Sequence, residues 1–258
     1  VYRAQHTVLG KEVAIKVLNA ATLVSSDGLK RFKREAESIG RLNHPNIVGT
    51  SDFGLSQDGR PYLIMDFIEG ETLSDMLDRV GTLDLKRFII ITEQLLNALQ
   101  HAHEEGFVHR DLKPGNIMID RNTPLEFGVK IVDFGLAKAI GEDSQYLTLT
   151  GETLGSPLYM SPEQCKGEAT DQRSDLYSLG CILFECLAGY QPIIGKNIAD
   201  TFKMHVEVKP LPFPDDCNVP PSIMLLVYKT LSKSTSDRPQ SAKELRELLH
   251  QALKEAKV

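Results

Sequence analysis

The feature that most constrains this chain is the polar stretch HRDLKPGN at residues 109–116. Its acid, Asp111, is followed two residues later by Lys113 and five residues later by Asn116. A second acidic stretch, Asp-Phe-Gly, begins at Asp133. A carboxylate, an ammonium and an amide at this spacing form a compact polar loop, which can orient a nucleophile and hold a metal ion. The chain must therefore fold so that the neighbouring segments hold this loop in place.

The segments on either side of the loop carry periodic patterns. Leu85 to Glu104 predicts a helix, because its apolar residues recur at spacings of three and four. Gly106 ends this helix. His101 and His103 near its end are interpreted as packing residues, since no third metal ligand is close in sequence. The apolar runs after the loop predict two short strands, Ile117–Ile119 and Val129–Val132.

The two halves of the chain differ in pattern. The first predicts a hairpin from residues 1–4 and 12–18, a helix over residues 29–42, and a strand over residues 62–68 that ends at a Glu-Gly-Glu link. The second is mainly helical, and the run over residues 171–187 is apolar on nearly all sides, which is typical of a buried helix. A capping box, Ser-Ala-Lys-Glu, opens the last helix.

Composition and charge exclude several classes of protein. Lys and Arg number 29 against 35 Asp and Glu, a net charge of −6, which argues against a surface that binds nucleic acid. The apolar runs are too short to span a bilayer, and no signal peptide is recognisable. The four cysteines have no metal-binding spacing, so we expect free thiols and a reducing, cytoplasmic compartment. They are Cys165, Cys181, Cys186 and Cys217.

Taken in order, the motifs resemble those of the eukaryotic-like serine/threonine protein kinases, most closely the bacterial ones. They are VAIK at residues 13–16, HRDLKPGN, DFG, and GSPLYMSPE at residues 155–163. The resemblance covers nearly the whole chain. It implies an α+β, bilobal protein-kinase fold in a single domain, residues 1–258, with a small β-rich N-lobe up to residue 68 and a larger helical C-lobe from residue 69.

The resemblance also implies roles in phosphoryl transfer. Asp111 would accept the proton of a Ser or Thr hydroxyl, and Lys113 would stabilise charge on the γ-phosphoryl group of ATP. Asn116 and Asp133 would bind Mg²⁺, with Mn²⁺ as an alternative. Two further acids would have structural roles: Asp175 would brace the backbone of the catalytic loop, and Glu163 would pair with Arg238.

ATP itself is expected to lie between the lobes. Lys16, paired with Glu35 of the predicted helix, would contact the α- and β-phosphates. Taken alone, Lys16 could equally be a strand-edge lysine that reaches solvent, and Glu35 would be an ordinary solvated helix charge. The adenine is expected to contact Ala14, Met65 (the gatekeeper), Asp66, Ile68 and Met118, which could also be plain core residues.

Regulation by phosphorylation is a further expectation. Arg110 precedes the catalytic acid, and a buried arginine there gains a partner when the activation loop carries phosphate. The candidate sites are Thr148, Thr150 and, less strongly, Thr153; the alternative is that they are ordinary loop hydroxyls. Ser156 stands where the family usually has threonine, and its hydroxyl is expected to reach the catalytic acid and lysine in the substrate-docking segment.

One departure from the family and three alternatives remain. The Gly-rich loop and first strand should precede Val1, so we expect the sequence to be part of a longer protein and to bind ATP poorly without them. A pseudokinase scaffold is the first alternative, a small-molecule kinase of the aminoglycoside phosphotransferase kind the second, and a non-enzymatic interaction module the third. The expected partners are protein substrates and a second copy of the chain for trans-autophosphorylation, with no nucleic acid or membrane contact.

Overall fold

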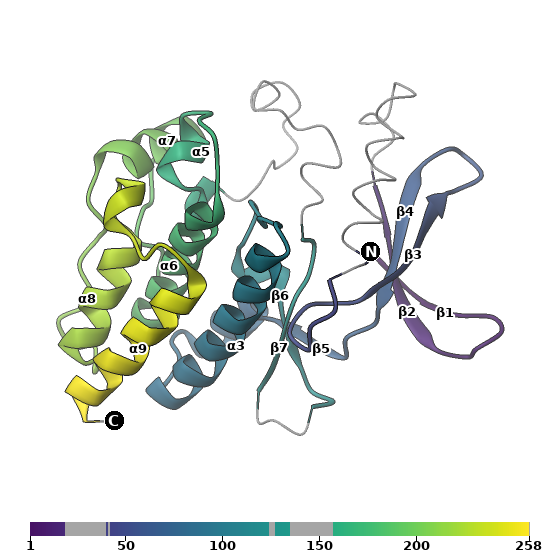
Figure 1. Ribbon diagram of the computed structural model, residues 1–258, viewed down its shortest axis with the longest axis horizontal. Helices are drawn as coiled ribbons and strands as arrows, with labels where there is room; N and C mark the ends of the chain where they lie inside the picture. The colour runs from purple at the N-terminus through teal and green to yellow at the C-terminus, as the bar shows by residue number, and fades with distance from the viewer. Residues whose placement is uncertain (19–39, 41, 124–126, 135–156, 258) are drawn as a thin grey trace.

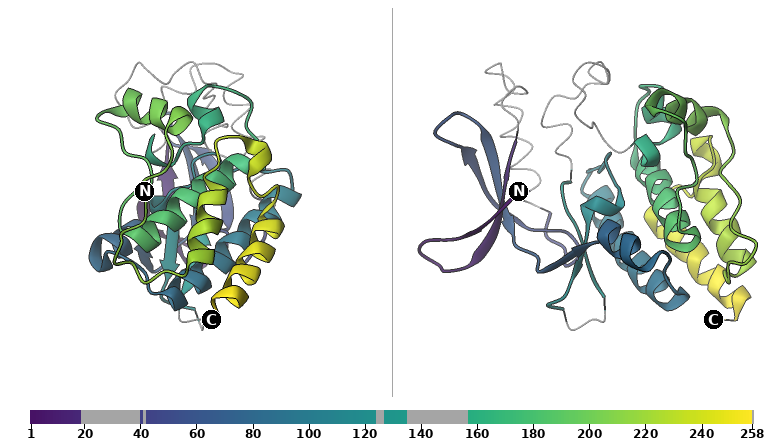
Figure 2. Two further views of the ribbon diagram at one scale, coloured as in Figure 1. Left: turned by 90° about the vertical axis from the view of Figure 1, so that its left-hand side faces the viewer. Right: turned by 180° about the vertical axis from the view of Figure 1, so that it is seen from behind.

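The computed structural model describes residues 1–18, 40, 42–123, 127–134 and 157–257. A four-stranded sheet forms one side of the molecule and a group of helices forms the other, with a small three-stranded sheet between them (Figures 1 and 2). The α+β, two-lobed architecture expected from the sequence is therefore confirmed.

The first sheet contains the predicted hairpin. Its strands are β1 (Tyr2–Gln5), β2 (Glu12–Val17), β3 (Thr50–Leu55) and β4 (Pro61–Asp66), in the order β1-β2-β4-β3 with every neighbouring pair antiparallel. The core of this sheet is small, and its buried side chains in the described residues are Leu18, Val48, Leu63 and Met65. The helix predicted over residues 29–42 lies almost wholly outside the described residues.

The second sheet joins the link between the lobes to the polar loop. It consists of β5 (Gly70–Thr72), β6 (Ile117–Asp120) and β7 (Gly128–Ile131) in that order. The residues expected to be an irregular link are thus partly a strand. Gly70 is required there, because a Cβ atom would lie 1.9 Å from the carbonyl oxygen of Ile119. This close pairing places the start of the helical lobe directly beside the loop that carries Asp111.

The helical lobe is built around two helices. The predicted helix α3 (Leu85–Glu104) has the expected bounds, and α6 (Gln172–Ala188) is buried along almost all of its length. Gly180 of α6 allows a close approach to α8, since a Cβ atom there would lie 2.3 Å from Oγ1 of Thr230. The other α-helices are α2 (Leu73–Val80), α5 (Pro162–Cys165), α7 (Ile198–Glu207), α8 (Pro221–Thr230) and α9 (Ala242–Ala256). The 3-10 helices are η2 (Pro114–Asn116), η4 (Pro157–Tyr159) and η5 (Thr235–Asp237).

The capping box predicted for the last helix is only half formed. Ser241 accepts a hydrogen bond from the backbone N–H of Glu244, as expected. The carboxylate of Glu244, however, accepts from the backbone N–H of Gln240 at 2.8 Å. The prediction was therefore right about the start of α9 and wrong about the partner of its glutamate.

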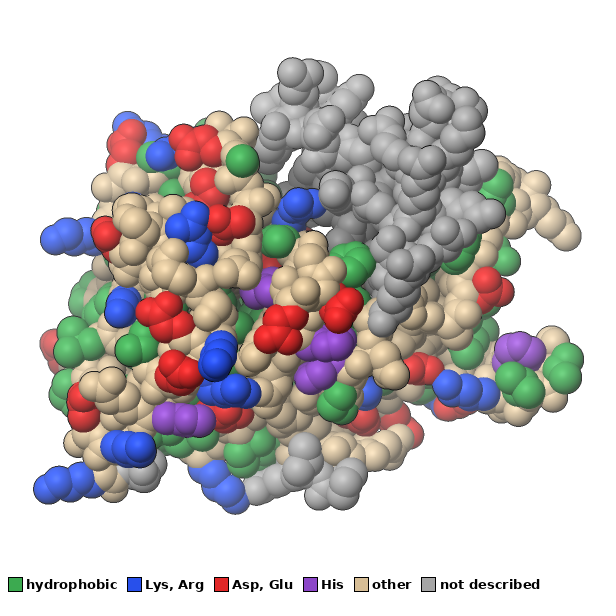
Figure 3. Space-filling model, in the orientation of Figure 1, with side chains coloured by type: hydrophobic (Ala, Val, Ile, Leu, Met, Phe, Trp, Pro, Cys, Tyr) green, Lys and Arg blue, Asp and Glu red, His purple; other side chains and the backbone are tan. Residues whose placement is uncertain are grey.

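The surface carries charges of both signs. On the face shown in Figure 3, acidic and basic side chains are interspersed over the helical lobe. No helix in the described part of the chain is long and apolar enough to cross a bilayer.

Candidate active site

The polar loop lies between α3 and β6, and a buried carboxylate from α6 holds its backbone. Asp175, which is 0% exposed, accepts hydrogen bonds from the backbone N–H groups of His109 at 2.8 Å and Arg110 at 2.9 Å. Nε2 of His103, on α3, lies 2.8 Å from the same carboxylate. Asp175 is thus placed as the sequence resemblance implied, and it connects α3, α6 and the loop.

The acid of the loop has two polar neighbours on one oxygen. Nζ of Lys113 lies 2.8 Å from Oδ2 of Asp111, and Nδ2 of Asn116 lies 3.2 Å from the same oxygen. Asn116 also donates to the backbone carbonyl of Asp111 at 2.7 Å. Within the described residues Oδ1 of Asp111 has no hydrogen-bond partner. Among the described residues, this oxygen is thus the one that an incoming hydroxyl group would meet without displacing a partner.

The two motif residues from different lobes meet in an ion pair. Nζ of Lys16, on β2, lies 2.7 Å from Oδ2 of Asp133, and both side chains are partly exposed. Asp133 has a positive φ of 65°, which turns the chain directly after β7. The next residue, Phe134, is buried and packs edge-on against the ring of His109, with 4.7 Å between the two ring centroids. This ring contact brings the polar loop and the second acidic stretch together.

The oxygen donors present fit a hard divalent cation. Nδ2 of Asn116 is occupied by Asp111, which leaves its amide oxygen as the available donor. The carboxylate of Asp133 supplies a second oxygen ligand. Two protein ligands of this kind, together with phosphate oxygens, are typical of Mg²⁺. No group of three or more His, Cys, Asp or Glu side chains in the described residues could hold a metal ion without such help.

The residues expected around the adenine lie at the junction between the lobes. Met65, on β4, is buried and pairs in register with Ala14 on β2. Ile68 packs against the same small core. The side chain of Asp66 pairs with Nζ of Lys11 at 2.6 Å. Met118 lies on β6 in the second sheet, so its joint contact with the base remains a prediction.

Behind Met65 there is a small apolar cavity that reaches the second acidic stretch. Its lining includes Met65 of the first sheet together with Asp133 and Phe134. The cavity connects the core of the small lobe to the residues that follow β7. The remaining lining residues are Ile47, Val48, Thr50, Leu63 and Ile131.

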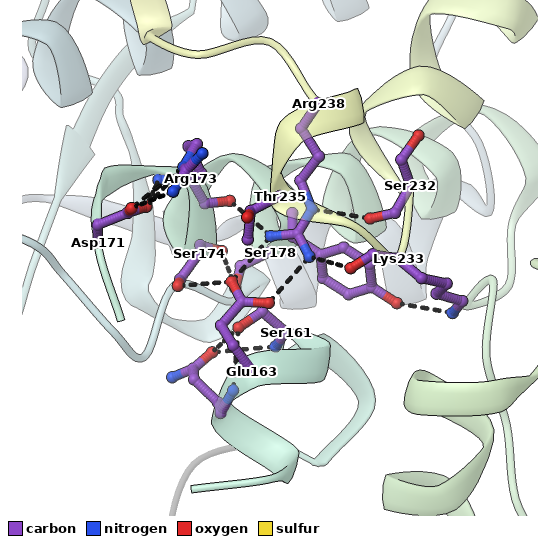
Figure 4. Close-up of polar contacts among 12 residues, drawn as sticks. Ser161, Glu163, Asp171, Arg173, Ser174, Ser178, Ser232, Lys233, Thr235 and Arg238 are labelled. Atoms are coloured by element: carbon purple, nitrogen blue, oxygen red, sulfur yellow. Dashed lines mark hydrogen bonds and ion pairs between the residues drawn. The ribbon is translucent and has the colours of Figure 1, made fainter. Parts of the chain in front are cut away.

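A buried ion pair joins two segments that are far apart in sequence, α5 and the residues just after η5. Arg238 donates from Nη1 and Nη2 to the two carboxylate oxygens of Glu163 at 2.8 and 2.9 Å (Figure 4). Ser174 donates to the same carboxylate at 2.7 Å. Burial by itself would raise the pKa of Glu163, but the hydrogen bonds from Arg238 and Ser174 outweigh it and lower the pKa below its usual value. The pair forms as the sequence resemblance implied.

Several predicted site residues cannot be placed. Glu35, Thr148, Thr150, Thr153 and Ser156 lie outside the described residues. The side chain of Arg110 is described, and its Nε donates to Oγ1 of Thr170 at 3.2 Å.

Two residues of this site were missed or misinterpreted in the sequence. His103 was taken for a packing residue, although it contacts Asp175 at a separation of 72 positions. Gln164 was not singled out, yet its side chain donates to the backbone carbonyl of Arg110. A histidine near the end of a helix has no sequence pattern that would predict a hydrogen-bond partner 72 positions away. The Gln three residues after Ser161 is a capping-box signal that could have been noticed.

Comparison with known proteins agrees with this geometry. Residues 1–253 match the family model described as the protein kinase domain. The chain therefore belongs to the protein kinase domain family, whose members use ATP and a divalent metal and act on protein substrates.

The curated relatives are bacterial. A probable serine/threonine-protein kinase of Streptomyces coelicolor is 40% identical over 95% of this chain and 37% of its own length. Serine/threonine-protein kinase pkn3 of Myxococcus xanthus is 39% identical over 99% of this chain and 48% of its own length. Serine/threonine-protein kinase PknB of Mycolicibacterium smegmatis is 38% identical over 95% of this chain and 39% of its own length. The chain thus spans less than half of the length of each of these relatives.

Among solved structures, the PknI kinase domain of Mycobacterium tuberculosis superposes with a TM-score of 0.73 at 25% identity. The match covers 97% of this chain and 89% of that domain. The resemblance to bacterial serine/threonine kinases is confirmed, and the chain is a serine/threonine protein kinase domain. Nothing in the comparisons favours a pseudokinase.

Proposed function

We propose that this protein transfers the γ-phosphoryl group of Mg-ATP to Ser or Thr hydroxyls of proteins, with Asp111 as the residue that accepts the hydroxyl proton. The observation that carries the proposal is the set of hydrogen-bond partners of the Asp111 carboxylate. Lys113 and Asn116 contact Oδ2, and no described residue hydrogen-bonds to Oδ1, which would receive the substrate hydroxyl. An acceptor oriented in this way contributes through positioning and proton transfer, which are the main needs of phosphoryl transfer.

The other residues of the site would position ATP. Lys16 would exchange part of its contact with Asp133 for the α- and β-phosphates, and Glu35 would hold it there. Asn116 and Asp133 would hold Mg²⁺, or Mn²⁺ in its place, which when bound neutralises phosphate charge. Lys113 would stabilise negative charge on the moving phosphoryl group. The adenine would lie against Ala14, Met65, Asp66, Ile68 and Met118.

Control of the reaction would reside in the segment before η4. We propose autophosphorylation of Thr148 or Thr150, with Thr153 as a lesser site, between two copies of the protein. Phosphate there would give Arg110 an anionic partner in place of its bond to Thr170. Ser156 would position the substrate beside Asp111. The four cysteines are free, which fits a reducing, cytoplasmic compartment.

The test is phosphate incorporation from labelled ATP, with sites mapped by mass spectrometry. Asp111→Asn should lower the rate by about 10²- to 10⁴-fold, because the proton acceptor is lost. The matched control Asp58→Asn removes the same charge from an exposed turn and should keep the wild-type rate. Phosphate on Thr148 or Thr150 that disappears in Asp111→Asn supports the proposal. ATP binding without incorporation into the protein or a general protein acceptor would refute it and favour a pseudokinase scaffold.

A further inference from the structure

The backbone of Arg110, the residue before the catalytic acid, is held from both sides. Arg110 has a φ of 65°, in the left-handed region that residues with a Cβ rarely adopt. Asp175 accepts from its N–H group at 2.9 Å. Its carbonyl oxygen accepts from Nε2 of Gln164 at 2.7 Å. This carbonyl belongs to the peptide bond that leads into Asp111. Its orientation therefore fixes the position of the Asp111 backbone, from which the catalytic side chain extends.

The other end of the Gln164 amide is bound to the start of α5. Oε1 accepts from the backbone N–H of Ser161 at 3.0 Å and from its hydroxyl at 3.1 Å. The hydroxyl of Ser161 in turn accepts from the backbone N–H of Gln164, which completes a capping box. This helix follows η4 closely, so a single side chain connects the end of the docking segment to the catalytic loop.

The chemistry of this connection requires glutamine. A glutamate of the same length could keep the capping box, since a carboxylate also accepts from Ser161. It could not donate to the carbonyl of Arg110, because an ionised carboxylate has no N–H or O–H group. Two carbonyl-type oxygens would then face each other. Replacement of Gln164 by Glu therefore separates its role at the helix from its role at the loop.

We propose that Gln164 is a positioning residue that couples the docking segment to the catalytic acid. The proposal rests on the proposed kinase function and adds a residue to it. When η4 and the start of α5 are in place, the amide of Gln164 holds the Arg110 carbonyl and so orients Asp111. Displacement of this segment withdraws the hydrogen bond and leaves the left-handed Arg110 supported from one side only.

The experiment compares Gln164→Glu with Ser161→Ala, which removes the capping hydroxyl and leaves the Gln164 donor. We expect Gln164→Glu to lower kcat about tenfold with KM for ATP unchanged, the size of effect expected for one hydrogen bond that orients a reacting group. Ser161→Ala should lower kcat by a clearly smaller factor than Gln164→Glu, because the Gln164 donor remains although α5 is less well capped. Equal loss of kcat in the two variants would show that Gln164 acts only through the helix, and would overturn the proposal.

Hydrogen–deuterium exchange tests the same contact without activity. Backbone amides of residues 109–113 should exchange faster in Gln164→Glu than in the wild type or in Ser161→Ala. Unchanged exchange would overturn the coupling whether or not the protein phosphorylates anything. If wild-type protein proves inactive while exchange responds as expected, the kinase proposal fails and the positioning role of Gln164 stands.

Discussion

One ion pair in the helical lobe and one in the sheet lobe differ sharply in burial. In the helical lobe the side chains of Glu163 and Arg238 are 6% and 0% exposed, and two hydrogen bonds join them. In the sheet lobe the side chains of Lys11 and Asp66 are 62% and 40% exposed. A buried pair is costly to break, whereas an exposed pair is screened by water and salt. The buried pair therefore makes this part of the helical lobe a fixed platform, whereas the Lys11–Asp66 pair contributes little to the sheet lobe.

The site lies where these two kinds of structure meet. The backbone just before Asp111 is held by Asp175, which is completely buried in α6. Lys16 reaches the site from the sheet lobe, and its pair with Asp133 is partly exposed on both sides. A partly exposed pair exchanges partners at a lower cost than a buried one, which suits the phosphate contact proposed for Lys16. A buried brace suits an acid that must stay in position.

The largest effect is expected from breaking the buried pair. Arg238→Met should lower the free energy of unfolding by about 3 to 5 kcal/mol, because it leaves the carboxylate of Glu163 buried without its main partner. Urea denaturation followed by circular dichroism would measure the change. The double variant Glu163→Met with Arg238→Met should recover much of the loss, since no buried charge remains. A loss below about 1 kcal/mol in the single variant would remove the distinction drawn between the lobes.

Sequence patterns predicted the parts of the fold that repeat locally. Helix α3 was predicted with its observed bounds, because a 20-residue helix repeats its apolar face through several turns. The catalytic loop was recognised from its motif, and the ion pair of Glu163 with Arg238 was inferred from the family resemblance. These features depend either on local periodicity or on a motif whose geometry is shared by the family.

The remaining features depend on contacts between residues far apart in sequence. His103 finds Asp175 only because α3 and α6 pack together. The carboxylate of Glu244 accepts from the backbone N–H of Gln240 and not from that of the cap residue Ser241, a choice of partner that the sequence pattern does not reveal. For Gln164, the sequence pattern predicts the capping contact, but it does not predict the hydrogen bond to the carbonyl of Arg110.

An intermediate effect should depend on pH. His205, on α7, is buried, and Nδ1 lies 2.9 Å from the hydroxyl of Tyr177. Burial, with a smaller contribution from Lys233, lowers the pKa of His205 to about 4. The unfolded chain binds a proton near pH 6.5 and the folded chain does not, so this contribution to stability is present above pH 6.5 and is lost as the pH falls towards 4.

The comparison of His205→Asn with wild type isolates this contribution. Between pH 7 and pH 4.5 wild-type protein should lose about 2 to 3 kcal/mol more unfolding free energy than the variant, because Asn does not titrate. Urea unfolding at the two pH values measures the difference. Parallel pH profiles for the two proteins would mean that His205 does not stay neutral in the folded helical lobe.

The smallest effect is expected in the sheet lobe. Lys11→Met removes the partner of Asp66 but leaves the stem of the side chain, so the free energy of unfolding should change by less than about 1 kcal/mol at low salt and less still at 0.5 M salt. Thermal unfolding at both salt concentrations measures the change. A larger and salt-independent loss would show that Lys11 fixes the end of β4, where the chain leaves the sheet lobe. The sheet lobe would then share the rigidity of the platform, and exchange of partners by Lys16 would have to occur within a fixed frame.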